Sequence, residues 1–180
     1  MTLAQKIAAT AARIIVEGEL TDWQLARRKA LAELRLPSRG VPLPTDEQIV
    51  RAITEHQRLF GGAEHEETLR QQRATALGLM HALRQFEPRL SGPVAEGWAH
   101  RGSEICIELR CASEKLIDYA LIELRLRYDV TSRPGGTHRY RVLDMTWPIS
   151  LLVFTSARER PPAGRTRLDI EALERLLGVR

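Results

Sequence analysis

The stretch LSGPVAEGWAHRGSEICIEL, residues 90–109, decides the fold predicted for this chain. It begins with a short apolar run, turns at Gly92 and Pro93, and ends in a segment that alternates apolar and polar side chains. On an extended strand this alternation separates two faces, with Ile105, Ile107 and Leu109 on one and Glu104, Cys106, Glu108 and Arg110 on the other. The pattern predicts two strands, LSGPVAEGWA and SEICIELRC, joined by a turn at HRG.

Helical patterns precede this stretch, because apolar residues recur at helical spacing in four segments. Thr21 or Asp22 can cap the second of them, and Thr45 with Gln48 three residues later forms a capping box for the third. Pro88 prevents the fourth helix from continuing. We therefore expect helices over residues 3–17, 22–34, 45–60 and 63–86.

The rest of the chain mixes strands with helices. We expect a helix over residues 113–126, strands over residues 139–145 and 148–155, and a closing helix over residues 168–177. The segments SRPGG and ARERPPAGRTR are expected to be a loop and an irregular connector. This order predicts an α+β fold, with an N-terminal helical region followed by a small mixed β-sheet flanked by helices. Residues 1–60 form the helical extension and residues 63–180 the α+β domain.

The composition is that of an ordinary globular protein, since 43% of the 180 residues are apolar and 28% are charged. No apolar run reaches the roughly 18 residues needed to span a bilayer, and the charged first helix does not resemble a signal peptide. Cys106 and Cys111 are the only cysteines, and they should point to opposite faces of one strand. These features predict a cytoplasmic protein with two reduced thiols and no membrane partner.

The basic charge is concentrated in the last third, where residues 127–180 hold ten basic and six acidic side chains. Four arginines there are candidate contacts for nucleic-acid phosphates: Arg158, Arg160, Arg165 and Arg167. A solvated loop is the alternative interpretation. Trp23 with the basic triplet at residues 27–29 also has two interpretations, an RNA-binding surface or a core tryptophan beside cations that face solvent.

The opening stretch resembles the active-site motif of nucleotidyltransferases of the polymerase-β-like superfamily. In that motif a glycine turn precedes a strand that carries two acids at alternate positions. The two carboxylates hold divalent metals that bind a nucleoside triphosphate, and the glycine lets the backbone approach its phosphates. Here Ser91-Gly92-Pro93 occupies the turn, residues 94–103 form the spacer, and Glu104-Ile105-Cys106-Ile107 occupies the strand. The resemblance covers roughly residues 63–155 and implies a nucleotidyltransferase-like fold.

The resemblance also implies roles for individual residues. Glu104 is the implied ligand for Mg²⁺ or Mn²⁺. Asp144 is the nearest carboxylate for a third ligand position, and both are catalytic only if the domain is active. Nucleotide contacts are implied at Gly92, Trp98, Arg101 and Ser103.

Departures from the motif predict a loss of catalysis. Pro93 has no N–H to offer a phosphate. Cys106 replaces the second acid, and a thiol is a poor ligand for magnesium. Glu108 lies about 13 Å from Glu104 along an extended strand, whereas paired catalytic metals are only about 3.5–4 Å apart. The matching position in the later strand is Ser150, which is not an acid.

The whole chain also resembles a small uncharacterised family of proteobacterial proteins, through DWQLARRKALAEL, LPTDEQIVRAITEHQRLF and FEPRLSGPVAEGWAHRGSEICIEL. Members of that family are sometimes labelled UDP-N-acetylmuramate–alanine ligase. Such ligases resemble multidomain ATP-binding enzymes with a glycine-rich phosphate loop. This chain has no G-x-x-x-x-G-K-[ST] and is too short for three domains, so its residues do not support that label.

The sequence thus predicts a bacterial pseudoenzyme with a nucleotidyltransferase-like fold. It would bind a nucleotide, a nucleic acid or a protein partner through a cleft near Gly92, Trp98, Arg101 and Glu104. Two alternatives stay open: an active metal-dependent nucleotidyltransferase that uses Glu104 and Asp144, and a nucleic-acid-binding module that uses the basic last third.

Overall fold

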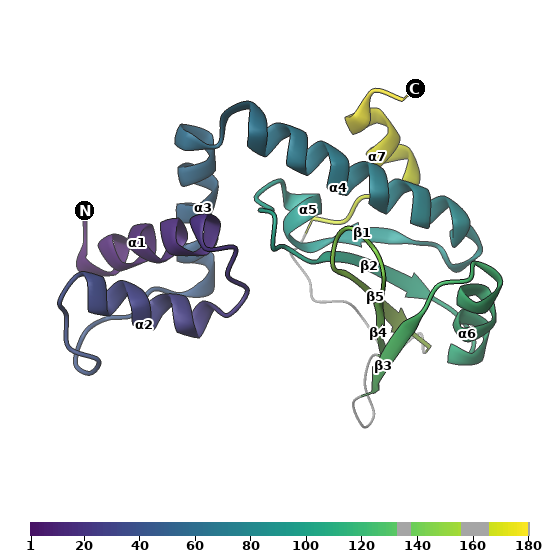
Figure 1. Cartoon of the computed structure of the whole chain (residues 1–180), viewed down its shortest axis with the longest axis horizontal. Helices are drawn as coiled ribbons and strands as arrows, with labels where there is room; N and C mark the ends of the chain where they lie inside the picture. Colours follow the sequence, from purple (N-terminus) through teal and green to yellow (C-terminus); the bar gives the residue numbers. More distant parts are fainter. Residues whose placement is uncertain (133–137, 156–165, 180) are drawn as a thin grey trace. The chain divides into compact units, whose positions relative to one another are not determined.

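The chain forms two compact units in the computed structural model, which describes residues 1–132, 138–155 and 166–179 (Figure 1). Residues 1–68 together with the loop 100–103 make up the N-terminal unit, and the remaining residues make up the sheet unit. Each unit has buried apolar side chains of its own. No helix among the described residues is both long and apolar enough to cross a membrane.

The N-terminal unit is built on three helices: α1 (Leu3–Glu17), α2 (Trp23–Glu33) and α3 (Asp46–Phe60). The side chain of Asp22 accepts hydrogen bonds from the first N–H groups of α2, and Thr45 with Gln48 forms the predicted capping box of α3. The predicted starts of both helices are therefore confirmed. Small and branched side chains form the core between the helices: Ile7, Ala11, Ile15, Ala26, Ala30, Ile49 and Ile53.

Arg27 of α2 is buried, although the sequence suggested that the basic triplet 27–29 faces solvent. Its Nε donates a hydrogen bond of 3.1 Å to the carbonyl of Pro44, and its guanidinium forms an ion pair with Asp46. Arg28 and Lys29 are exposed, as expected. Arg27 therefore fastens α2 to the start of α3 and is not part of a free basic surface.

The sheet unit contains five strands in the order β1-β2-β5-β4-β3. The strands are β1 (Arg89–Ser91), β2 (Ile105–Arg110), β3 (Tyr128–Ser132), β4 (His138–Val142) and β5 (Ile149–Phe154). β2 and β5 are parallel, while the other neighbouring pairs are antiparallel, so the sheet is mixed. The predicted α+β architecture, N-terminal helices followed by a mixed sheet with helices, is confirmed.

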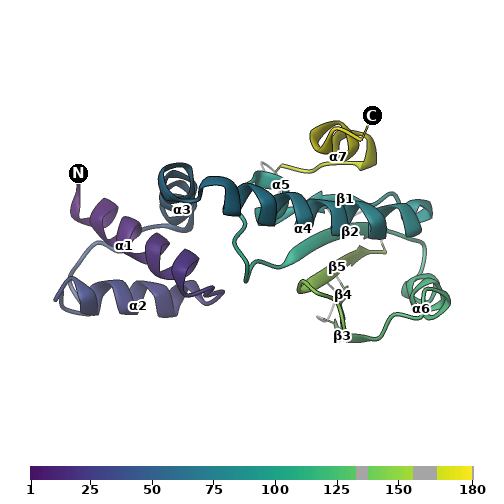
Figure 2. The same cartoon turned by 45° about the horizontal axis from the view of Figure 1, so that its top comes forward.

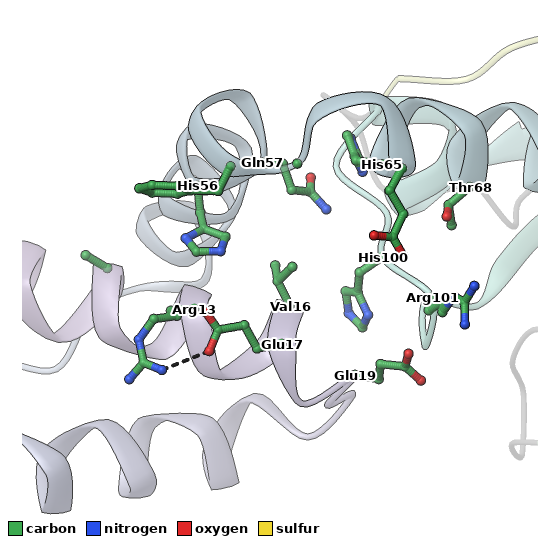
Figure 3. Close-up of a pocket in the computed structure, with 14 residues that line it drawn as sticks. Arg13, Val16, Glu17, Glu19, His56, Gln57, His65, Thr68, His100 and Arg101 are labelled. Atoms are coloured by element: carbon green, nitrogen blue, oxygen red, sulfur yellow. Dashed lines mark hydrogen bonds and ion pairs between the residues drawn. The ribbon is translucent and has the colours of Figure 1, made fainter.

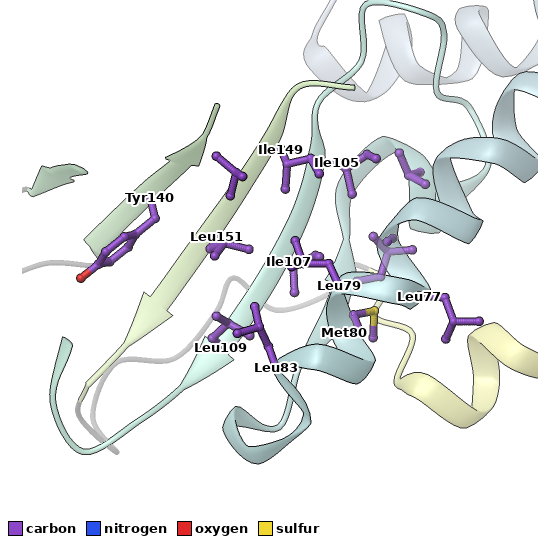
Figure 4. Packing of buried hydrophobic residues seen from close by; sticks show 14 of the residues in the cluster. Leu77, Leu79, Met80, Leu83, Ile105, Ile107, Leu109, Tyr140, Ile149 and Leu151 are labelled. Carbon is purple, nitrogen blue, oxygen red and sulfur yellow. The ribbon is translucent and has the colours of Figure 1, made fainter. Parts of the chain in front are cut away.

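One face of the sheet is apolar and is covered by α4 (Gly62–Ala82) and α6 (Glu114–Glu123). Figure 4 shows Met80 and Leu83 directed toward Ile107 and Leu109 of β2. The α7 helix (Ile170–Leu177) lies beside α4 in both views (Figures 1 and 2). Six strand residues on this face have no exposed surface: Ile105, Ile107, Leu109, Ile149, Leu151 and Val153.

The predicted strand LSGPVAEGWA is wrong for most of its length, because β1 ends at Ser91 and Gly92–Glu96 forms a short helix, α5. Gly92 has φ +70°, a left-handed conformation that glycine adopts without steric strain. Pro93 then stands in the first turn of α5, where a helix does not need its missing N–H. The glycine turn of the motif therefore leads from a strand into a helix.

The β3 strand was not predicted, because the helix before it was expected to run to residue 126. Instead α6 ends at Glu123, and Arg125 adopts a left-handed conformation with φ 55°. Helices commonly end in this way at a glycine, and here no glycine marks the position. Most of SRPGG and of ARERPPAGRTR lies outside the described residues.

Candidate functional site

The sheet brings the glycine turn next to β2, the strand that begins directly after Glu104. β1 pairs with β2 so that Ser91 lies opposite Cys106. A Cβ added at Gly92 would lie 3.7 Å from the Cys106 sulfur, in ordinary van der Waals contact. The two parts of the motif, separated by a spacer in the sequence, are therefore direct neighbours on the polar face of the sheet.

Glu104, which directly precedes β2, is held by one partner from β5 and one from β4. Ser150 of β5 donates a hydrogen bond from its Oγ to Oε1, and Arg139 of β4 pairs with Oε2 at 3.1 Å. Ser150 is completely buried and lies opposite Cys106 in the parallel pairing of β2 with β5. The negative charge of Glu104 is thus balanced by an arginine of the same unit.

Cys106 contributes a protonated thiol beside this carboxylate. Its sulfur lies 3.8 Å from Glu104 Oε2. Burial, followed by the negative charge of Glu104, raises the thiol pKa to about 12. The thiolate, which is the form that binds metals, is therefore not populated at neutral pH. Cys106 and Cys111 are both free cysteines in the structure.

Glu108 forms a buried ion pair with Arg167. Its Oε2 accepts a hydrogen bond of 2.7 Å from Arg167 Nε, and the side chains are only 9% and 17% exposed. Arg167 was a candidate contact for nucleic-acid phosphates, but here it pairs with a carboxylate. The other candidates, Arg158, Arg160 and Arg165, lie outside the described residues.

Asp144 does not join Glu104. It follows β4 in the turn before β5, and its carboxylate forms an ion pair with Arg127 on the protein surface. Asp144 thus has Arg127 as its ion-pair partner, whereas Glu104 is held by Ser150 and Arg139.

These residues do not fit a divalent metal. Magnesium needs several hard oxygen ligands around one point, and here a single carboxylate is bonded to a hydroxyl and an arginine. The neighbouring position holds a neutral thiol, whose pKa is raised by burial. Among the described residues, no group of three histidine, cysteine or acidic side chains is arranged to hold a metal ion.

Trp98 packs in the sheet unit, close to α5. It is 8% exposed, and its indole N–H donates a hydrogen bond of 2.7 Å to Glu96. Arg73 of α4 donates from Nε to the carbonyl of Val94 at 3.1 Å, and burial lowers its pKa. Trp98 is thus a packed side chain that supports α5, and Gly92 is the implied nucleotide contact that lies at the turn itself.

Arg101 and Ser103 belong to the N-terminal unit, within the loop 100–103. The Ser103 hydroxyl accepts a hydrogen bond of 2.9 Å from the backbone N–H of His100, so it stabilises the predicted HRG turn. The Arg101 side chain is exposed. Gly102 lies so close to Glu19 that an added Cβ would meet its carbonyl oxygen at 2.5 Å.

Two residues that hold Glu104 were not assigned this role from the sequence. The sequence shows only that the position of Ser150 carries no acid, and nothing in it marks Arg139 as a partner of Glu104. The alternation of polar and apolar residues predicts that Ser150 and Arg139 lie on the polar faces of their strands. It does not predict that β5 lies next to β2 in the sheet and β4 next to β5. That order is a property of the tertiary structure.

No protein-family model matches this chain, and neither does any curated protein or solved structure. The function proposed for the chain therefore rests on the geometry of the site.

Proposed function

We propose that the sheet unit is a nucleotidyltransferase-like domain that has lost catalysis and binds a nucleotide at its polar face. The observation that carries this proposal is the state of Glu104, whose charge is balanced by Arg139 and whose second oxygen accepts from Ser150. In the superfamily motif a divalent metal would balance that charge. An internal guanidinium does so in this protein.

The likeness to the nucleotidyltransferase motif is supported by the order of elements around Glu104. A helix leads to a strand, a glycine turn and a short helix, and then to the strand that follows the acid. Cys106 occupies the second acid position, and Ser150, its direct neighbour on β5, occupies the position of a third. Two of three ligand positions therefore carry neutral side chains.

A nucleotide is the ligand that we favour, because β4 presents two arginines on the same polar face. Arg139 and Arg141 are two residues apart, which places them about 7 Å from one another along the strand. Both side chains are exposed, and guanidinium groups bind phosphates through paired N–H donors. Two of the three metal-ligand positions of the motif carry neutral side chains, and Arg141 is exposed beside the Arg139–Glu104 pair. Together these features favour binding of phosphates without a metal.

A binding assay without metal tests this proposal. We expect a nucleoside triphosphate to bind the full chain in the presence of a chelator, and Arg141→Ala to weaken that binding about tenfold, because one charge-assisted contact is lost. Arg28→Ala, at an exposed site on α2, is the matched control. Unchanged affinity in Arg141→Ala would contradict a phosphate site on β4.

Two further assays separate the alternatives. Incubation with labelled nucleoside triphosphates and Mg²⁺ or Mn²⁺ should give no product, whereas incorporation that Glu104→Ala abolishes would establish an active nucleotidyltransferase. Salt-dependent binding of RNA or DNA that weakens when Arg158, Arg160 and Arg165 become alanine would instead support the nucleic-acid-binding module. A protein partner would leave all three assays negative.

A further inference from the structure

A pocket of about 580 Å³ lies within the N-terminal unit (Figure 3). Its walls come from α1, α3, the first turns of α4 and the loop 100–103. Small-molecule sites typically measure about 300–1,000 Å³. Of the described residues, none from the polar face of the sheet lines this pocket, so it is independent of the site proposed on the sheet.

Two buried polar side chains form the floor of the pocket. Gln57 of α3 is 5% exposed and His100 of the loop is 6% exposed. Figure 3 shows them with Val16 in the middle of the lining residues. Polar groups that are buried beside an open volume are typical of sites where a few hydrogen bonds orient a ligand.

Both floor residues are uncharged. The backbone N–H of Gly102 donates to His100 Nδ1 at 3.1 Å, so the imidazole carries its proton on Nε2. Burial lowers the pKa of His100 to about 4, which keeps the ring neutral at physiological pH. An ion placed against neutral groups in a buried floor loses hydration without gaining a counter-charge. The inserted part of a ligand must therefore be polar but uncharged.

The wall beside this floor is aromatic. The rings of His56 and Phe60 are in contact, with centroids 5.1 Å apart, and the Phe60 side chain is 74% exposed. Such a surface offers a face on which a flat ring can stack. At the rim, Arg13 is already bonded to Glu17 at 2.9 Å and to Glu33 at 2.6 Å, so it is not a free anion-binding group.

We infer that this pocket binds the base of a nucleoside. An uncharged heteroaromatic ring with hydrogen-bond donors and acceptors matches the neutral polar floor of Gln57 and His100, and its flat face matches the wall of His56 and Phe60. The rim, where the Arg13–Glu17 ion pair meets solvent, accommodates the sugar.

Titration of the full chain with adenosine, guanosine, cytidine and uridine, followed by NMR of the imidazole groups, tests this inference. At least one nucleoside should bind with a Kd below about 1 mM and shift the signals of His56 and His100. His81 and His138 belong to the sheet unit and serve as internal controls. Their signals should not move.

Variants sharpen the same titration. Gln57→Leu should weaken binding about tenfold, because it leaves the base without one polar partner, whereas Lys29→Ala, exposed on α2, should change nothing. If Gln57→Leu does not fold, the histidine signals of the unaltered chain still decide the question.

Three results would overturn the inference. The first is that no nucleoside binds below about 1 mM. The second is that binding shifts His138 and leaves His56 and His100 unmoved. The third is that toluene binds as tightly as the best nucleoside. Toluene cannot form hydrogen bonds with Gln57 or His100, so equal affinity would mean that these two side chains do not contribute to binding.

Discussion

The two faces of β2 differ in what they bury and in what each residue contributes. On the apolar face, Ile105, Ile107 and Leu109 have no exposed surface and belong to the hydrophobic core of the unit. On the polar face, Glu104 and Glu108 each have a separate arginine partner. The apolar face stabilises the unit through the area that it buries. The polar face depends on individual pairs, so removing one member leaves its partner unsatisfied.

The largest effect should come from breaking the buried pair on the polar face. Arg167→Ala leaves the Glu108 carboxylate buried without a counter-charge, which should lower the free energy of unfolding by about 3–5 kcal/mol. Urea denaturation measures this loss. The double variant Glu108→Leu with Arg167→Leu should recover most of it, and a single variant within about 1 kcal/mol of the parent would show that the pair is solvated.

On the apolar face, Ile107→Ala should lower the free energy of unfolding by about 3 kcal/mol, because it removes buried methylene groups and leaves a cavity beneath α4. The same denaturation experiment provides the value. Leu116→Ala, at a partly exposed position of α6, is the control and should cost clearly less. Equal losses in the two variants would mean that the sheet core is loosely packed.

The raised pKa of Cys106 makes the stability of the sheet unit depend on pH. Its folded pKa of about 12 lies above the ordinary value of 9.0, so the unfolded chain loses the thiol proton first as the pH rises. Below pH 9 the thiol is neutral in both the folded and the unfolded chain, and the free energy of unfolding keeps its full value. Above pH 9 the unfolded thiol ionises, and the free energy of unfolding falls by about 2 kcal/mol near pH 10.5. Cys106→Ala should lack this alkaline loss in denaturation curves, and an unchanged pH dependence would contradict the burial of the thiol.

Gly92→Ala should destabilise the unit by about 1 kcal/mol, because alanine is strained at a φ of +70°. The added Cβ itself would make only ordinary contact with Cys106. Gly78 provides a matched control within α4, since no atom outside its own stretch of helix lies within 4 Å of the place that its Cβ would occupy. Gly78→Ala should be neutral or stabilising, and a similar loss in both variants would remove the argument for a required turn.

The smallest effect should come from Arg139→Ala. The ion pair with Glu104 is 47% and 29% exposed on its two sides, and pairs this exposed contribute about 0–1 kcal/mol. A thermal melt should therefore shift only slightly. A loss close to that of Arg167→Ala would show that Glu104 is as dependent on its arginine as Glu108 is.

Local patterns predicted the elements that depend on neighbouring residues. The alternation in SEICIELRC correctly separated Ile107 from Cys106, and the caps at Asp22 and Thr45 correctly placed two helix starts. The class of the fold followed from the order of these elements.

Other features could not be read locally. The turn at Arg125 uses a residue with no glycine-like signal, and the short α5 helix resembles a strand because its apolar run is brief. The partners of Glu104 come from β4 and β5, which lie 35 and 46 residues further along the chain. Only the strand order brings them together.

Metal binding at Glu104 tests the central claim most directly. Mn²⁺ can be titrated into the unaltered chain and into the double variant Cys106→Asp with Ser150→Asp, with free Mn²⁺ measured by electron paramagnetic resonance. We expect no Mn²⁺ site that depends on Glu104 in the unaltered chain, and a new site in the double variant, where three carboxylates meet on neighbouring strands. Mn²⁺ bound by the unaltered chain and released by Glu104→Ala would contradict the account.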